Sequence, residues 1–307
     1  MITALAGGVG AARFLEGLVA VVNPADVTAI VNTGDDAVFH GLHVSPDIDI
    51  VLYTLAGLVD PRKGWGVQGD SYHALGMLAR YGRDTWFQLG DRDLATHIVR
   101  SELLATGEPL SRVTDRLRLA LRVQTRLLPM TDTPVGTMVR TPEGVLAFQE
   151  YFVHQRTNPE VLEIIYRGMA EAPPGPGVLS ALSEADAVVI CPSNPLVSIG
   201  TILAIPPIRA ALTETKARRV AVSPIVAGGT IKGPADRMLR GLGWEASAYG
   251  VAEFYRGLVD VFVFDQQDAH LKGRIEALGY DVVVTDTIMR DATVKRELAR
   301  TVLGAAG

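Results

Sequence analysis

The feature that most limits the fold of this chain is a set of short β-branched runs that each end at glycine, serine or aspartate. Runs that are apolar on both faces are typical of parallel strands buried between two layers of helices. Segments with helical periodicity separate several of them, at residues 12–21, 199–212, 235–242 and 268–278. The pattern predicts repeated β-α-β units, and therefore an α/β fold with a Rossmann-like, mostly parallel sheet and helices on both faces. The six expected strands are Ile2–Leu5, Val27–Val31, Ala187–Ile190, Val220–Ser223, Val261–Phe264 and Val282–Val284.

The middle of the chain follows a different pattern. Residues 68–120 are helical in pattern, whereas 137–140 and 145–152 alternate around a Thr-Pro-Glu-Gly turn and predict an antiparallel pair. A proline- and glycine-rich linker at 172–177 then leads back to the sheet. We therefore expect a Rossmann-like core of residues 1–125 and 185–307, with a smaller inserted α+β subdomain at 126–184.

Composition narrows the classes of partner. A formal charge of -5 leaves no large basic field to attract nucleic acid. No apolar run approaches the roughly 18 residues of a membrane helix, and the N-terminus has no basic or long apolar leader. The single cysteine, Cys191, cannot form an intramolecular disulfide, which favours a reducing compartment. We expect a cytoplasmic protein with neither nucleic-acid nor membrane partners.

A glycine-rich loop follows the first expected strand, at residues 6–13. Glycines let the backbone approach a phosphate, and a helix that starts there offers free N–H groups. Position at a strand-to-helix switch favours phosphate binding over a plain tight turn. The loop is not a P-loop, because no Gly-Lys-Ser/Thr follows, and Arg13 stands where a dinucleotide fingerprint has its third small residue.

Carboxylates gather after the second expected strand, in Asn-Thr-Gly-Asp-Asp at 32–36 and Ser-Pro-Asp-Ile-Asp at 45–49. Four carboxylates near one strand end repel each other unless a cation or buried protons relieve them, which indicates a divalent metal such as Mg²⁺ with phosphates. The alternative, that Asp35 and Asp47 only cap turns and helix starts, is equally compatible with the spacing.

Three further segments complete the candidate site. Residues 86–97 combine aromatic and charged side chains that would suit a flat heterocycle, although their spacing favours a loop that caps a helix starting near Asp93. Segments 192–200 and 223–234 each run from a strand to a helix start, so both would present backbone N–H groups to the crevice of the glycine loop. Lys232 adds a cation there, and the neighbouring Cys191 is interpreted as a small buried filler.

Together these loops, at 7–10, 32–36, 45–49, 89–97, 193–200 and 223–233, resemble those of the 2-phospho-L-lactate transferase (CofD) family. The resemblance covers nearly the whole chain and includes the strings at 127–132, 249–255 and 259–265. It implies an Mg²⁺-dependent enzyme of deazaflavin coenzyme (F-420) biosynthesis. Such enzymes move a phospho-acid unit from a guanosine diphosphate-linked donor to the terminal ribityl hydroxyl of the deazaflavin Fo and release GMP.

The transferred acid in this family is lactate, enolpyruvate or glycerate. The strings around 35–36, 40–42 and 62–66 are similar to those of actinobacterial members, which use the phosphoenolpyruvyl donor and make dehydro coenzyme F-420-0. The resemblance also implies a homodimer.

The family's functional residues carry over to this sequence in three groups. The catalytic residues and metal ligands are Asp35 and Asp36. The deazaflavin is expected at Thr33, Asp47, Asp49, Gln88 and Asp91, although relatives have basic or acidic residues at the position of Gln88. The nucleotide is expected at Gly8, Gly10, Ser193, Asn194, Ser198, Gly200, Ser223, Gly229 and Lys232.

Two alternatives belong to other classes. An acidic residue about 25 positions after a glycine turn also occurs in NAD-dependent oxidoreductases, but the third small residue is missing here. A related family of non-catalytic nucleotide-sugar-binding regulators shares the glycine loop and the Ser-Asn-Pro motif. The string at 89–97 is more similar to that of the transferases.

Overall fold

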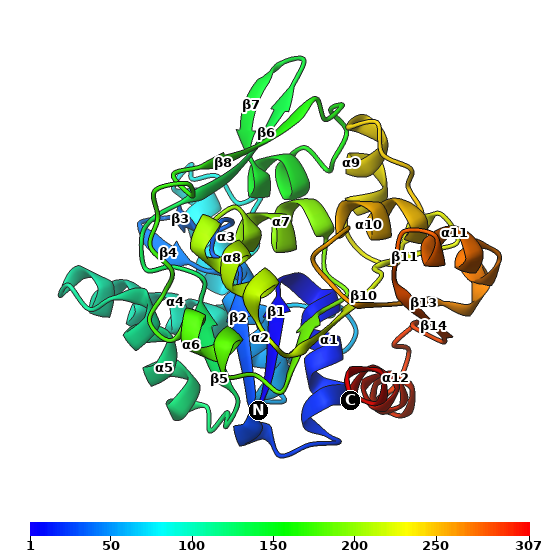
Figure 1. Cartoon of the computed structure of the whole chain (residues 1–307). Coiled ribbons are helices and arrows are strands. Elements are labelled where there is room, and N and C mark those ends of the chain that lie inside the picture. The colour runs from blue at the N-terminus through cyan, green and yellow to red at the C-terminus, as the bar shows by residue number, and fades with distance from the viewer.

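The computed structural model describes all 307 residues and contains a seven-stranded, entirely parallel sheet with helices on both faces (Figure 1). All six expected strands are present, and the sheet has one strand more. The strands are β1 (Ile2–Ala6), β2 (Val27–Val31), β5 (Arg126–Pro129), β9 (Ala187–Ile190), β10 (Arg218–Val222), β13 (Val261–Asp265) and β14 (Asp281–Thr285).

The order of the strands fixes where a ligand can bind. Across the sheet they run β5-β2-β1-β9-β10-β13-β14, so the chain builds outward from β1 in one direction and then, from β9, in the other. In open α/β sheets the crevice lies beyond the carboxyl ends of the two strands where this reversal occurs. Here these strands are β1 and β9, which pair directly.

Alternate residues of each strand enter two separate cores. Leu5 packs into the core on one face of the sheet, whereas Ala4 and Ala6 pack into the core on the other face. The face with Ala4 is covered by α1 (Gly8–Val19), α2 (Pro46–Leu55), α5 (Leu110–Ala120) and α12 (Ala292–Ala306). The opposite face is covered by α6 (Val178–Ser183), α7 (Gly200–Leu203), α8 (Pro206–Glu214), α9 (Ala235–Gly241), α10 (Ala248–Phe254) and α11 (Lys272–Glu276).

The remaining elements are short or lie outside these layers. The helices are η1 (Pro24–Asp26), α3 (His73–Arg80), α4 (Asp91–Ala105), η2 (Glu150–His154), η3 (Pro195–Ile199) and η4 (Gln266–Leu271). The strands are the hairpins β3 (Ala37–Phe39) with β4 (Leu42–Val44) and β11 (Ile225–Val226) with β12 (Gly229–Thr230), and the antiparallel sheet of β6 (Gly136–Thr141), β7 (Gly144–Ala147) and β8 (Glu163–Arg167).

The additional strand, β5, lies in the segment that we assigned to the insertion. It pairs in parallel with β2, with Leu128 opposite Ile30. The strand has four residues, ends at Pro129 and contains no β-branched residue, so it lacks the signal that identified the others. Residues 126–129 therefore belong to the parallel sheet, and the position of the domain boundary stays a prediction.

The small antiparallel sheet, at the top of Figure 1, confirms the expected hairpin but not its length. The second strand was expected to reach Phe152, yet it ends at Ala147 and the chain then enters the π-helical turn η2. Phe148 and Tyr151 are buried there in the same core as Leu5. Burial of these aromatic side chains against the large sheet outweighs continued strand pairing.

Two expected helices are broken. Residues 199–212 divide between α7 and α8, because Pro206 lacks an N–H group and starts a new helix. Residues 268–278 divide between η4 and α11. No single helix is long and apolar enough to cross a membrane; Pro195–Leu203 and Pro206–Glu214 pass that test only as a pair, and they are bent by 88°.

Candidate functional site

A cavity of about 930 Å³ lies at the carboxyl end of the sheet, next to the crevice between β1 and β9. This is the upper part of the range for small-molecule sites. The loops after β1, β2, β9, β10 and β14 form part of its wall, and further parts come from α2, α4, η2, η3, residues 86–88 and the loop around Trp65. Segments from the whole length of the chain therefore meet at one cavity.

The first part of the site is the glycine loop. Helix α1 begins at Gly8, four residues earlier than expected, so the glycines form its first turn. The N-cap residue Gly7 has no side chain that could cap this helix, and apart from the Gly8 amide, which faces the Asp47 carboxyl, the N–H groups of the first turn are available to an anion. The loop lies against the loop after β9: the Gly7 amide donates to the Ser193 hydroxyl at 3.2 Å, and a Cβ on Gly10 would lie only 2.1 Å from the Pro192 carbonyl oxygen.

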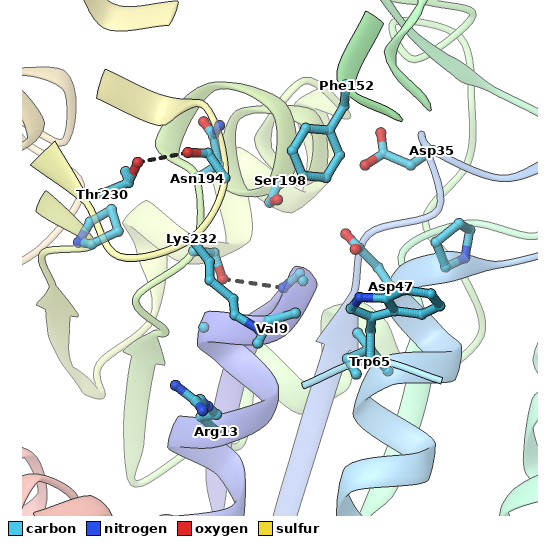
Figure 2. Close-up of a pocket in the computed structure, with 18 of the residues that line it drawn as sticks. Val9, Arg13, Asp35, Asp47, Trp65, Phe152, Asn194, Ser198, Thr230 and Lys232 are labelled. Carbon is cyan, nitrogen blue, oxygen red and sulfur yellow. Dashed lines mark hydrogen bonds between the residues drawn. The ribbon is translucent and has the colours of Figure 1, made fainter. Parts of the chain in front are cut away.

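Cationic side chains surround this loop. Arg13, Lys63, Lys232 and Arg290 line the cavity, and Figure 2 shows Arg13 and Lys232 beside Val9. Lys232 donates to the Lys63 carbonyl at 2.6 Å. Burial and the charge of Arg13 lower the pKa of Lys232. Neither Arg13 nor Lys232 forms an ion pair with a carboxylate. Two cations without carboxylate partners beside a helix start have the chemistry that suits a phosphate-bearing ligand.

Across the cavity lie the acidic residues Asp35 and Asp47 (Figure 2). Burial and the charges of Asp47 and Asp36 raise the pKa of Asp35 well above its ordinary value. Burial also raises the pKa of Asp47 to about 7, although the amide of Asn32 donates to Asp47 at 2.9 Å. Burial and mutual repulsion thus favour the protonated forms of these two carboxyl groups, and a cation bound beside them would act in the opposite direction.

Asp36 has partners of its own. Its Oδ2 lies 3.0 Å from the ring nitrogen Nε2 of His43 and accepts a hydrogen bond from Ser45 at 2.7 Å. Burial raises the pKa of Asp36, and these partners act in the opposite direction. His43 and Ser45 therefore hold one oxygen of Asp36 and leave the other free.

Three buried oxygen atoms in the loop after β2 have no hydrogen-bond partner and mark a candidate metal site. They are Oγ1 of Thr33 and Oδ1 of both Asp35 and Asp36. Mg²⁺ prefers such oxygen ligands, and it usually binds through one or two carboxylates with water and substrate phosphate completing the shell. No group of three or more His, Cys, Asp or Glu side chains converges on one point. The residues present therefore fit an Mg²⁺ ion that also binds a phosphate, and not a cage made by the protein alone.

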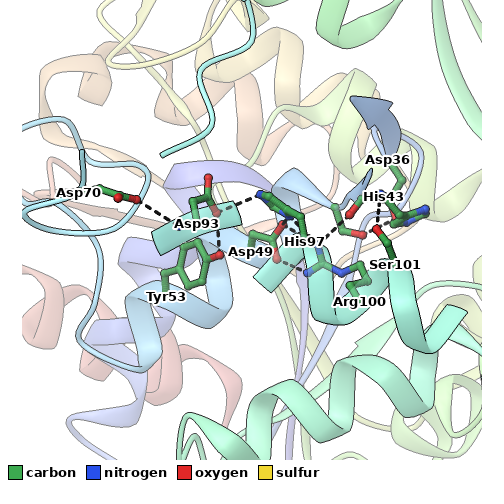
Figure 3. A network of polar contacts seen from close by, with 10 residues as sticks. Asp36, His43, Asp49, Tyr53, Asp70, Asp93, His97, Arg100 and Ser101 are labelled. Atoms are coloured by element: carbon green, nitrogen blue, oxygen red, sulfur yellow. Dashed lines mark hydrogen bonds and ion pairs between the residues drawn. The ribbon is translucent and has the colours of Figure 1, made fainter. Parts of the chain in front are cut away.

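A second polar network lies on the other side of α2. Asp47 and Asp49 are two residues apart in the first turn, so they point in nearly opposite directions around the helix. Asp49 faces α4, where Arg100 binds both of its carboxylate oxygens and His97 lies 3.7 Å away (Figure 3). Asp93 accepts a hydrogen bond from Tyr53 at 2.7 Å.

Sequence analysis missed one residue of this network, Arg100. Asp93, His97 and Arg100 follow the i, i+4, i+7 spacing of one helix face, a polar stripe that could have been found in the sequence. Asp93 lies within the helix, and Asp70 caps its start by accepting hydrogen bonds from the Arg92 and Asp93 amides.

Aromatic side chains form the remaining wall, from Trp65, Trp86, Phe87, Phe148 and Phe152. Trp86 stacks on His154 with ring centroids 5.1 Å apart, and Phe148 stacks on Phe152 at 5.6 Å. These contacts hold the rings as flat surfaces that suit a planar heterocycle.

The structure brings most of the predicted site residues together, but not all. Those that line the cavity are Gly8, Gly10, Asp35, Asp47, Asp49, Gln88, Ser193, Asn194, Ser198, Ser223 and Lys232. Thr33 and Asp36 share a loop with Asp35 but lie outside the cavity wall, and Gly229 lies in the β11–β12 hairpin.

Asp91 and Gly200 have local contacts that account for them. The Asp91 carboxylate accepts hydrogen bonds from Ser71 and from the His73 and Ala74 amides, so it caps the start of α3 instead of lining the cavity. Gly200 packs under Tyr166, where a Cβ would lie 2.5 Å from the phenol oxygen.

Comparison with known proteins gives a consistent result. The family described as 2-phospho-L-lactate transferase CofD matches residues 2–303. A phosphoenolpyruvate transferase of Kitasatospora aureofaciens is 45% identical over 99% of this chain and 97% of its own. A 2-phospho-L-lactate transferase of Methanosarcina acetivorans is 39% identical over 98% and 97%. The crystal structure of a UPF0052 family member from Bacillus halodurans has the same fold, with a TM-score of 0.64, 16% identity and 98% coverage of both chains.

Proposed function

Since the chain belongs to the 2-phospho-L-lactate transferase (CofD) family, we propose that it transfers a phosphoenolpyruvyl unit from a guanosine diphosphate-linked donor to the terminal ribityl hydroxyl of the deazaflavin Fo. The products would be GMP and dehydro coenzyme F-420-0. Relatives named phosphoenolpyruvate transferase, at 45% and 43% identity, support the enolpyruvyl donor over the lactyl donor, since two relatives named 2-phospho-L-lactate transferase are 39% and 37% identical.

The observation that carries the proposal is the division of the cavity into two chemically different ends. One end has the uncapped start of α1 and the unpaired Arg13 and Lys232, which suit a diphosphate. The other, beside η2, has the flat aromatic side chains of Trp86, Phe148 and Phe152, which suit a tricyclic heterocycle. The carboxyl of Asp35 lines the same cavity, so a hydroxyl and a phosphorus atom held at the two ends could meet beside it.

The reaction is a phosphoryl transfer. The ribityl oxygen forms a bond to the phosphorus that carries the acid, the bond from that phosphorus to the bridging oxygen breaks, and GMP leaves with the electron pair. The hydroxyl proton must pass to a base, and Asp35 or Asp36 is the residue we assign to this role. General base catalysis of this kind contributes about 100- to 10,000-fold to a rate.

Thr33, Asp35 and Asp36 would hold the Mg²⁺ ion that the family resemblance implies, because their unpartnered oxygens are the available hard ligands. Bound there, the ion would neutralise the charge that develops on the phosphate oxygens. The chain's own residues perform the remaining tasks. Asn32 holds Asp47, His43 and Ser45 hold Asp36, and the first turn of α1 would bind the diphosphate.

The test is to incubate the purified protein with Fo, Mg²⁺ and each guanosine-linked donor in turn, and to follow the mass of the deazaflavin. We expect a gain of one phosphoenolpyruvyl unit, equimolar GMP, and loss of the reaction when Mg²⁺ is chelated. A gain only with the lactyl donor would correct the donor assignment. Binding of GDP or Fo without turnover of any donor would instead favour a non-catalytic regulator. We also propose that the protein is a homodimer in the cytoplasm. Light scattering of the purified protein would test the dimer.

A further inference from the structure

Arg100 is the largest side chain that is fully buried in the protein, and it carries a charge. It lies in the middle of α4, with 0% of its surface exposed. A guanidinium in such a place is strongly destabilising unless ionised partners surround it. The burial of this charged side chain indicates that its contacts have a specific role.

The main contact of Arg100 is a fork to Asp49. Nη1 donates to Oδ2 at 3.0 Å and Nη2 donates to Oδ1, so both carboxylate oxygens are held in one plane. Nη1 also lies 3.2 Å from Nδ1 of His97, one turn earlier on α4. Burial disfavours the charge on Arg100, but Asp49 outweighs this effect and raises the pKa of the guanidinium.

Asp49 lines the cavity although Arg100 does not. The carboxylate thus stands between a buried cation and the space where a ligand binds. Beside it, His97 and Asp93 also line the cavity, and Asp93 accepts a hydrogen bond from Tyr53. Arg100 is the only arginine or lysine that pairs with Asp49, and it binds both carboxylate oxygens, whereas His97 lies 3.7 Å away, so the orientation of Asp49 depends mainly on Arg100.

We propose that Arg100 is a positioning residue for the acceptor substrate: its fork fixes the orientation of the Asp49 carboxylate and aims it into the cavity, where it accepts a hydrogen bond from a hydroxyl or N–H group of the deazaflavin. This inference rests on the proposed function, which assigns Asp49 to the acceptor. Arg100 acts through Asp49 and has no contact with the nucleotide end of the cavity. Its removal should therefore affect one substrate and not the other.

A purely structural role makes a different prediction. If Arg100 only braces α4 against α2, its loss would loosen α2, which also carries Asp47 near Gly8 of the nucleotide loop. The affinities for GDP and for Fo would then fall together, in step with thermal stability. The ratio of the two affinities separates the explanations.

The experiment measures Kd for Fo and for GDP in the full-length wild type and in R100M, R100K, D49N and the double variant D49N/R100M. We expect R100M to bind Fo about 10- to 100-fold more weakly, as for the loss of a charge-assisted hydrogen bond, with GDP affinity unchanged. R100K keeps the charge without the fork and should recover part of the Fo affinity. The double variant should bind Fo no more weakly than D49N, because Arg100 acts through Asp49.

The matched control is R118M, which removes the arginine of another helical Arg–Asp pair, with Asp115 on α5, outside the cavity. It should change neither affinity. Wild-type Fo affinity in R100M, equal losses for Fo and GDP, or additive effects in the double variant would each overturn the inference. If R100M does not fold, the Fo and GDP affinities of R100K and of the double variant still distinguish the two explanations. Failure of the wild type itself to bind Fo would refute the proposed function, a result distinct from these.

Discussion

Replacing Gly10 with alanine tests the close approach of two loops that shapes the nucleotide end of the cavity. The added Cβ would lie 2.1 Å from the carbonyl oxygen of Pro192, in the loop after β9. A carbon atom and a non-bonded oxygen normally stay about 3.3 Å apart. Since both partners are backbone, the first turn of α1 and the loop after β9 would have to separate by about 1 Å.

The expected consequences are a modest loss of stability and a large loss of function. Overpacking of this kind costs about 1–3 kcal/mol, which lowers the Tm by a few degrees. Displacement of the α1 N–H groups should weaken GDP binding at least about tenfold, because they would no longer reach a phosphate held by the opposite loop. A misplacement of 1 Å reduces turnover by about 100-fold.

The measurement is the affinity for GDP by calorimetry together with the Tm of the free protein. Gly76→Ala is the matched control, because Gly76 lies in the exposed helix α3 with nothing within 4 Å of its added Cβ. It should raise stability by about 0.5–1 kcal/mol and leave GDP affinity unchanged. A Gly10→Ala variant with wild-type GDP affinity would show that this close approach has no part in nucleotide binding.

Three further predictions concern charged residues. Asp36→Asn should bind GDP normally but lose about 100- to 10,000-fold in transfer rate, and near-wild-type turnover at saturating Mg²⁺ would exclude Asp36 from the mechanism. Lys232→Ala should weaken GDP binding about tenfold in a titration, whereas unchanged affinity would remove Lys232 from the phosphate site. Because the pKa of Asp47 is raised to about 7, the folded state holds its proton after the unfolded state has lost it, so stability falls as pH rises toward 7. In metal-free denaturant titrations, the free energy of unfolding of the wild type should fall by about 3 kcal/mol relative to Asp47→Asn between pH 5 and 8, and parallel pH dependence of the two proteins would contradict this assignment.

The sequence was sufficient to predict most of the sheet. A strand buried on both faces is rich in small or β-branched residues with few polar groups, as at Val27–Val31, and this pattern is visible without any tertiary information. β5 lacked the pattern because its leucines favour helix and strand alike and Pro129 ends it early. The strand that was expected to reach Phe152 ends at Ala147, although its sequence has the alternating pattern, because burial of Phe148 and Tyr151 determines the local structure.

For the site, the sequence predicted the loops and missed what connects them. Loops that follow parallel strands must gather at one edge of the sheet, so Gly8 and Ser193 could be placed together in advance. Asp91 was assigned to the acceptor, yet it caps α3, a role that depends on the path of a loop twenty residues earlier. Arg100 shares with Asp93 and His97 a polar helix face that is visible in the sequence, but its pairing with Asp49 requires the packing of α4 against α2, which no local pattern specifies.

The position of β1 inside the sheet has a consequence for synthesis of the chain. One edge of β1 pairs with β2, which follows within 31 residues, but the other edge pairs with β9, where Leu5 meets Ile190. At about 5–20 residues per second, a ribosome needs roughly 10 to 40 s to supply that partner. Throughout this interval an apolar strand edge of the nascent chain remains open to wrong pairing. The end of the cavity beside β1 and β9 is thus completed long after the glycine loop that begins it has been synthesised.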